Sequence, residues 1–357
     1  MKRFKILLLA AVVLLSAAGP GSFYAYKWYQ DSQKKYQTVR VAESRPGVYK
    51  LPHYLALKKN FYRDQYVKVR QVDCLDDREA LAALENGQAD VALVNPSSLV
   101  FKRAAELKKG VGPLAFASLD LGTNYHLVAR ENKPLADMQS LKNKTVIAGT
   151  QDSLETMFLE ITMREAGFNP YEAVTIITNI PPEIRLGALK AGTGHYLLLE
   201  EKDLPAALAG GLFPVKSFKA GFPSFVCVSA RQFMDQQPEA LQRLTNGLYL
   251  AQSWLRHHSP GEAASAVGSL EGLDKKELPG LVARYYEAGS LPVSPVINSQ
   301  KLDPVIKMLD KSREIPMPVS GSELVAGQFA DIAVKTVQYV PEDKQKKSLL
   351  QRLKFWK

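Results

Sequence analysis

Short polar segments follow two of the β-branched stretches of this chain, at positions where a small molecule could be bound. Ser44-Arg45-Pro46-Gly47 comes soon after residues 38–41, and Asn95-Pro96-Ser97-Ser98 comes directly after residues 91–94. Ligands of parallel sheets gather beyond the carboxyl ends of the strands. The hydroxyl, amide and guanidinium groups of these segments could hydrogen-bond a small polar molecule. Each segment could equally be an ordinary turn.

These segments are expected to be positioned by alternating strands and helices. The expected strands are residues 38–41, 67–69, 89–94, 114–118, 124–129, 145–148, 174–177 and 196–199. Helical patterns separate most of them, and further helices are expected at 238–255, 275–287 and 302–309. Strands that alternate with helices imply parallel pairing, so the fold class is α/β. About 300 residues between the two ends are long for a single core and favour two lobes.

The amino terminus has the pattern of an export signal. A basic start is followed by an apolar run from residue 6 to 18, and residues 6–26 carry no charged side chain. Ser16-Ala17-Ala18 offers a cleavage site, whereas the whole uncharged stretch approaches the ~20 residues that span a bilayer. Residues 1–36 are therefore either a signal peptide or an N-terminal membrane anchor. Both alternatives place the rest of the chain in a periplasmic or extracytoplasmic compartment.

The net charge of +10 lies mostly at the two ends of the chain. Residues 1–36 hold six Lys/Arg and one acid, giving +5, and residues 341–357 hold six and two, giving +4. The remaining +1 gives the folded part no basic patch of the kind that binds nucleic acid, so that partner class is excluded. We expect residues 331–357 to form a basic, helical C-terminal tail, which either contacts an anionic membrane or is frayed.

The reactive side chains do not form a recognisable catalytic or metal motif. Cys74 and Cys227 are far apart in sequence, which suggests small buried residues, although a disulfide is an alternative in an oxidising compartment. His53, His126 and His195 are isolated, and no HExxH, paired-cysteine site or nucleophile elbow occurs. We therefore expect no enzyme activity, no cofactor and no metal.

Four segments resemble the extracytoplasmic solute-binding proteins of ABC importers, in the branch that takes up nitrate, taurine, alkanesulfonates or thiamine precursors. They lie at 46–62, 80–92, 135–146 and 237–255, in the order and spacing of that family. The second, Ala80-Leu81-Ala82-Ala83-Leu84-Glu85-Asn86-Gly87-Gln88-Ala89-Asp90-Val91-Ala92, is the most specific. The resemblance covers about residues 38–310.

The resemblance implies a periplasmic-binding-protein fold of type II, in which each lobe is a mainly parallel sheet flanked by helices. The first lobe would comprise residues 37–122 and 221–330, and the second residues 123–220. A ligand would be held between them, and the closed form would be presented to an ABC permease. The ligand-binding residues that it implies are Ser44, Arg45, Tyr49, Asn95, Ser97, Ser98, Asn124, Tyr125, Gln151, Asp152 and Ser153.

Two departures from the family pattern bear on the ligand. Gly192-Thr193-Gly194-His195-Tyr196 and Glu200-Glu201-Lys202 stand where relatives have an acidic residue with alanine and then Glu-Pro. The charge of Asp152 would oppose a bound anion. A cationic, zwitterionic or neutral molecule therefore fits the chain better than nitrate.

The expected function is capture of a small polar organic molecule by hinge closure, for an ABC importer. The alternatives are a membrane-anchored ligand sensor or scaffold with the same fold, and an enzyme of the pyrimidine-synthesis type. A sensor would need a separate signalling partner, because no kinase or cyclase segment follows the binding fold in this sequence.

Overall fold

The computed structural model describes residues 35–341 apart from residues 45, 107–111, 152, 271–274, 312–314 and 316. The export segment, Arg45, Asp152 and the end of the basic tail lie outside the described residues. Among the residues that are described, no helix has both the length and the apolar character needed to cross a membrane.

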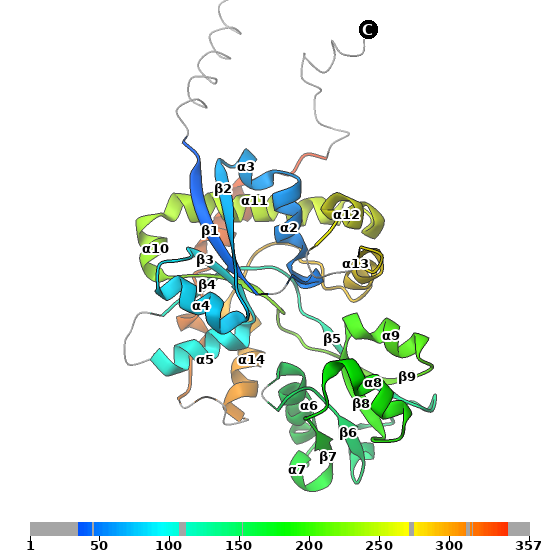
Figure 1. Ribbon diagram of the computed structural model, residues 1–357. Helices are drawn as coiled ribbons and strands as arrows, with labels where there is room; N and C mark the ends of the chain where they lie inside the picture. Colours follow the sequence, from blue (N-terminus) through cyan, green and yellow to red (C-terminus); the bar gives the residue numbers. More distant parts are fainter. Residues whose placement is uncertain are drawn as a thin grey trace, which may run out of the picture.

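The first lobe is built on a five-stranded sheet of order β2-β1-β3-β10-β4, in the upper part of Figure 1. Its strands are β1 (Gln37–Glu43), β2 (Val67–Asp73), β3 (Val91–Val94), β4 (Leu114–Ser118) and β10 (Val226–Ser229). β1 pairs in parallel with β2 and β3, and only β10 runs against the other four. Every residue of β3 is buried, because helices cover both faces of this sheet.

The second lobe repeats this plan with the order β7-β6-β8-β5-β9. Its strands are β5 (Asn124–Ala129), β6 (Thr145–Ile147), β7 (Thr175–Ile177), β8 (Tyr196–Glu200) and β9 (Phe213–Lys219). Here β5 is the strand that runs against the other four. The predicted α/β class and two mainly parallel sheets are confirmed. The sequence analysis contained no strand corresponding to β9 or β10.

Helices surround both sheets. Those of the first lobe are α2 (Leu51–Lys58), α3 (Phe61–Asp64), α4 (Asp77–Glu85), α5 (Pro96–Glu106), α10 (Arg231–Gln236), α11 (Pro238–Arg256), α12 (Pro260–Val267), α13 (Leu278–Glu287), α14 (Ser299–Lys311) and α15 (Gln328–Thr336). Those of the second lobe are α6 (Leu154–Glu165), α7 (Pro170–Ala173), α8 (Pro182–Lys190) and α9 (Leu204–Ala209). Short 3₁₀ turns occur at Val48–Lys50, Met138–Leu141, Glu201–Asp203 and Gly321–Glu323.

Two segments of chain cross between the lobes and form the hinge, residues 119–123 and 220–225. Leu119 donates its N–H to the carbonyl of Phe225 (3.1 Å), and Ala220 donates to Thr123 (3.2 Å). Gly122 has a φ of +102°, and a Cβ placed on it would lie 2.1 Å from the carbonyl oxygen of Phe222. Only glycine allows the two backbones to approach this closely.

α14 makes an additional connection between the lobes. It packs against α5 of the first lobe and against α6 of the second, and its buried face belongs to one apolar cluster with residues of both lobes. Lys311 at its end lies 3.5 Å from Glu165 of α6. Movement of the lobes about the hinge must therefore shift α14 against α6.

Two expectations about the rest of the chain can be compared with the structure. α15 packs against α11 and β4, and its Ala330 and Ala333 are fully buried, so the boundary expected at residue 331 falls inside this helix. Cys74 and Cys227 are both free thiols. Cys227 is buried, whereas Cys74 is only half-buried.

Candidate functional site

A cavity of about 330 Å³ lies where the two lobes and the hinge meet, and we call it the interlobe cavity. It is lined by Tyr49, Asn95, Ser97, Thr123, Tyr125, Ser153, Leu154, Glu155, Glu200, Lys202, Phe222, Ser224 and Phe225. The volume is at the small end of the roughly 300–1,000 Å³ that ligand sites occupy, so it suits a compact molecule.

The wall that belongs to the first lobe is neutral and is organised by the start of α5. The side-chain oxygen of Asn95 accepts hydrogen bonds from the backbone N–H (3.0 Å) and the hydroxyl (2.9 Å) of Ser97. Asp77 at the start of α4 accepts the backbone N–H of Asn95 (2.7 Å) and holds this turn against the sheet. The side-chain NH2 group of Asn95 and the hydroxyl oxygen of Ser97 can hydrogen-bond a ligand.

Tyr49 connects the first lobe to the hinge. Its hydroxyl lies 2.6 Å from the hydroxyl of Thr123, which in turn donates to the carbonyl of Asn124 (3.1 Å). Tyr49 therefore acts as the donor to Thr123. Burial raises the pKa of Tyr49 well above its usual value, with a further contribution from Glu200, so the phenol stays neutral.

A buried carboxylate, Asp120, ties the two hinge segments together. It accepts backbone N–H groups from Gly122 (2.6 Å), Ser224 (2.7 Å) and Phe225 (2.9 Å). Burial raises its pKa to about 7, although the three N–H groups favour the charged form. This set of bonds fixes the hinge residues that form one side of the cavity.

The wall that belongs to the second lobe carries charge. Ser153 caps α6 by accepting the backbone N–H of Thr156 (3.3 Å), and Glu155 follows in the first turn. The carboxylate of Glu155 pairs with Arg185 of α8 at 3.0 Å. A Cβ on Gly149 would lie 2.2 Å from both Glu155 Oε1 and Ser153 Oγ, so this glycine provides the space for the carboxylate.

Glu200 and Lys202 extend the same wall from the end of β8. Their side chains form an ion pair of 2.8 Å and are 24% and 47% exposed. The intervening Glu201 points elsewhere, because it accepts hydrogen bonds from Asn124 (3.0 Å) and pairs with His126 (2.8 Å). Burial of Glu201 works against its charge, yet these two hydrogen bonds hold its pKa below the usual range.

The sequence of residues 48–263 matches the family described as NMT1/THI5 like, which accounts for more than half of the chain. The protein belongs to the NMT1/THI5-like family. A curated relative is YtlA of Bacillus subtilis (strain 168), which is 24% identical over 298 residues, or 82% of this chain and 89% of YtlA. Family membership therefore extends across both lobes.

Two solved structures show the same fold. The periplasmic nitrate-binding protein NrtA from Synechocystis PCC 6803 superimposes with a TM-score of 0.63 at 13% identity, covering 88% of this chain and 92% of NrtA. The periplasmic aliphatic sulphonate binding protein SsuA from Escherichia coli gives 0.59 at 18% identity, covering 81% of this chain and 97% of SsuA. At these identities the likeness shows the shared fold of this NMT1/THI5-like protein and no more.

Five of the residues expected to bind a ligand line the interlobe cavity of this NMT1/THI5-like chain: Tyr49, Asn95, Ser97, Tyr125 and Ser153. They come from both lobes, as the resemblance implied. Their role in binding stays a prediction.

Four of the other expected residues lie apart from the cavity lining. Ser44 and Ser98 donate to the carboxylate of Asp77 (2.8 and 3.3 Å), the same carboxylate that accepts the backbone N–H of Asn95. Asn124 is bonded to Glu201, and Gln151 is exposed outside the lining. Arg45 and Asp152 lie outside the described residues.

The sequence analysis missed most of the charged and aromatic lining. Glu200 and Lys202 were noticed only as a departure from the family pattern, although they follow a strand of the second lobe as Asn95 follows one in the first. Glu155 could have been included with Ser153, two residues before it. Phe222, Ser224 and Phe225 reach the cavity through the hinge, a position that no local pattern indicates.

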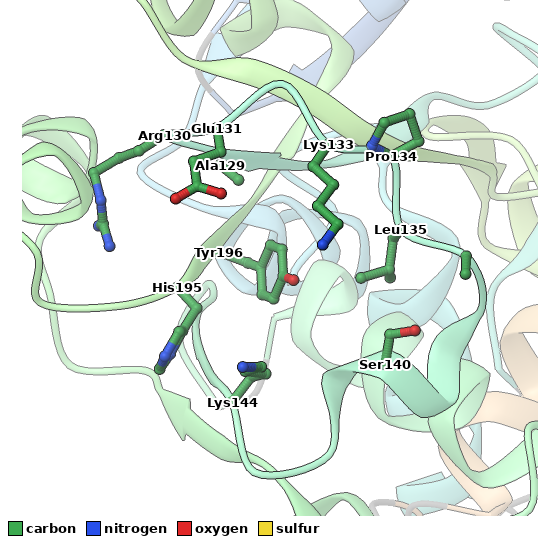
Figure 2. Close-up of a pocket in the computed structure, with 11 residues that line it drawn as sticks. Ala129, Arg130, Glu131, Lys133, Pro134, Leu135, Ser140, Lys144, His195 and Tyr196 are labelled. Carbon is green, nitrogen blue, oxygen red and sulfur yellow. The ribbon is translucent and has the colours of Figure 1, made fainter.

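A larger hollow of about 570 Å³ occurs in the second lobe, at the end of β5 and the starts of β6 and β8. Figure 2 shows Lys133 extending over it toward Tyr196, with Arg130 and His195 along one edge. The guanidinium of Arg130 donates hydrogen bonds to the carbonyls of Leu189 and Gly194, and His195 accepts the N–H of Thr145 (3.0 Å). Because one lobe supplies all of its lining, closure of the two lobes would not enclose a ligand there.

Proposed function

We propose that this protein is an extracytoplasmic solute-binding protein that captures a small polar organic molecule and delivers it to an ABC permease in the cytoplasmic membrane. The observation that carries this proposal is the interlobe cavity, in which Asn95 and Ser97 of the first lobe face Glu155 and Glu200 of the second. A molecule in this cavity touches both lobes and can therefore favour the closed arrangement.

The hinge supports the mechanism. Asp120 joins its two chain segments through hydrogen bonds, and Gly122 lets them approach closely. The packed surface between α14 and α6 can slide. Hinge and shear movements of this kind close two-lobed proteins around ligands. The free energy of ligand contacts with both lobes shifts the population toward the closed form.

The side chains of the cavity support binding without catalysis. No histidine or cysteine occurs in its described lining. Ser153 caps α6, the hydroxyl of Ser97 donates to the side chain of Asn95, and Glu155 and Glu200 are each paired with a cation. None of these serines has the neighbouring base that activates a nucleophile.

The relatives support the transport role and the compartment. NrtA and SsuA are named as periplasmic proteins that bind nitrate and aliphatic sulphonate. We transfer the class of activity from them, and not the solute. The basic and apolar segment at residues 1–26 would direct this chain across the membrane, as a cleaved signal or as an anchor.

The distance between the lobes tests the proposal directly. Spin labels are placed on the full chain at Leu75→Cys in the first lobe and Glu183→Cys in the second, with Cys74→Ser and Cys227→Ala, because both labelled sites are exposed. A metabolite library is first screened by thermal shift, where a ligand at ~100 times its Kd adds about 2.7 kcal/mol of stability. Hits should shorten the distance between the labels. Hits that bind without any change in this distance would refute capture by closure.

A further inference from the structure

The second-lobe wall of the interlobe cavity has more acidic than basic groups. Glu155 and Glu200 both line the cavity, and their side chains are 13% and 24% exposed. Lys202 is the one basic side chain in the described lining, against these two acidic ones. An arriving anion meets an unbalanced negative charge, whereas an arriving cation neutralises it.

The charge of Glu155 is disfavoured in the cavity without a ligand. Burial is the main reason that its pKa is raised to about 7; the charge of Glu200 also raises it, while Arg185 and Lys202 lower it. A positively charged ligand group beside Glu155 would favour its carboxylate form.

The remaining lining suits the body of such a ligand. Tyr49, Tyr125 and Phe222 contribute aromatic rings, which attract cations through their faces and bury apolar surface. Ser224 is 9% exposed and lies in the same lining, next to the buried carboxylate of Asp120 that accepts its backbone N–H. Its hydroxyl can hydrogen-bond a polar group of the ligand.

We propose that the solute of the interlobe cavity is a small organic cation, an amine or a protonated nitrogen heterocycle, whose charge is held by Glu155 and Glu200. The aromatic rings contact its body, and Ser224 hydrogen-bonds a second polar group. This inference rests on the proposed function and specifies its substrate class. It separates this chain from relatives whose names specify nitrate or sulphonate.

Probes that differ only in charge test this proposal. Benzylamine, benzyl alcohol and benzenesulfonate share one ring, and titration calorimetry with the full chain compares them at pH 7.5 and low salt. Equal sublibraries of organic cations, anions and neutral molecules extend the comparison by thermal shift. We expect binders among the cations alone, with affinity that weakens as salt increases.

The two proposals fail in different ways in this comparison. Binding and lobe closure with anions or neutral molecules, but not with cations, would overturn the cation assignment and leave solute capture in place. Absence of binders in all three sublibraries would overturn both.

Variants assign the charge recognition to individual residues. Glu200→Gln and Glu155→Gln should each weaken binding of a cationic hit by about tenfold or more, since hydrogen bonds to charged groups are the strong ones. Glu183→Gln is the matched control, an exposed glutamate of the same lobe outside the cavity, and should leave the Kd unchanged. Glu200 is the more exposed of the pair, so its variant is expected to fold even if Glu155→Gln does not. Equal affinity in Glu200→Gln and Glu183→Gln would refute the assignment.

Discussion

The two walls of the interlobe cavity are built by different means. The first-lobe wall is neutral, and the groups of Asn95 and Ser97 are held by bonds between residues two apart in sequence. The second-lobe wall is charged, and Glu155 is held by Arg185, thirty residues away. The hydrogen-bonding groups of the first wall are therefore placed by the local sequence at a helix start. The charged groups of the second wall are instead placed by contacts between segments that are distant in sequence.

The largest effect is expected where the walls are joined. Gly122→Ala should lower the free energy of unfolding by about 3 kcal/mol or more, because the new Cβ would collide with the Phe222 carbonyl at 2.1 Å and the φ of +102° is strained for alanine. Urea denaturation of the full chain measures this loss.

Gly221→Ala is the matched control in the facing hinge segment. Gly221 also has a positive φ, of +78°, but a Cβ there would have nothing within 4 Å. Its loss should be about 1 kcal/mol, the conformational cost alone. Equal losses in the two variants would show that close approach of the hinge segments is not required.

The charged wall should make stability depend on pH, and the neutral wall should not. Glu155 has an unfolded pKa of about 4.3 and a folded pKa of about 7. The folded state therefore holds the extra proton between these values, and stability falls as pH rises through this window. The full loss, reached above pH 7, should be about 4 kcal/mol.

Unfolding free energies of Glu155→Gln and of the unaltered chain, measured from pH 4 to 8, isolate this effect. The unaltered chain should lose more stability across the window, while a residual slope from Asp120, which titrates near the same pH, remains in both. Asn95→Ala, on the neutral wall, should lower stability by about 1 kcal/mol at every pH through loss of a helix cap. If the unfolding free energies of Glu155→Gln and of the unaltered chain change in parallel with pH, the raised pKa assigned to Glu155 is wrong.

The fold was accessible from the sequence because its signals are local. Val91-Ala92-Leu93-Val94, followed by a capping group and a proline, has the pattern of a buried parallel strand leading into a helix, and the structure has β3 and α5 there. β9 was missed because Phe213-Pro214-Val215 contains a proline. Proline is tolerated here because β9 is an edge strand of the sheet.

The site was only partly accessible, for the same reason. Asn95 and Ser153 follow strands at helix starts, so position along the chain was enough to select them. Phe222 and Ser224 depend on how the second crossing packs on the first, which is a contact between residues a hundred positions apart. Ser44 was selected by the same local rule as Asn95, but its hydroxyl is directed to Asp77 and not to the cavity.

The smallest expected effect concerns the contact of the neutral wall with the hinge. Tyr49→Phe removes the hydrogen bond to Thr123 and should cost about 1 kcal/mol of unfolding free energy. Tyr285→Phe is the matched control, because its ring packs edge-on against Tyr49 while its buried hydroxyl has no hydrogen bond within the described residues. Removing that hydroxyl should be neutral or slightly stabilising, since it ends the burial of an unsatisfied group. If both variants lose the same stability, the cost lies in altered ring packing, and the Tyr49–Thr123 bond does not help to join the first lobe to the hinge.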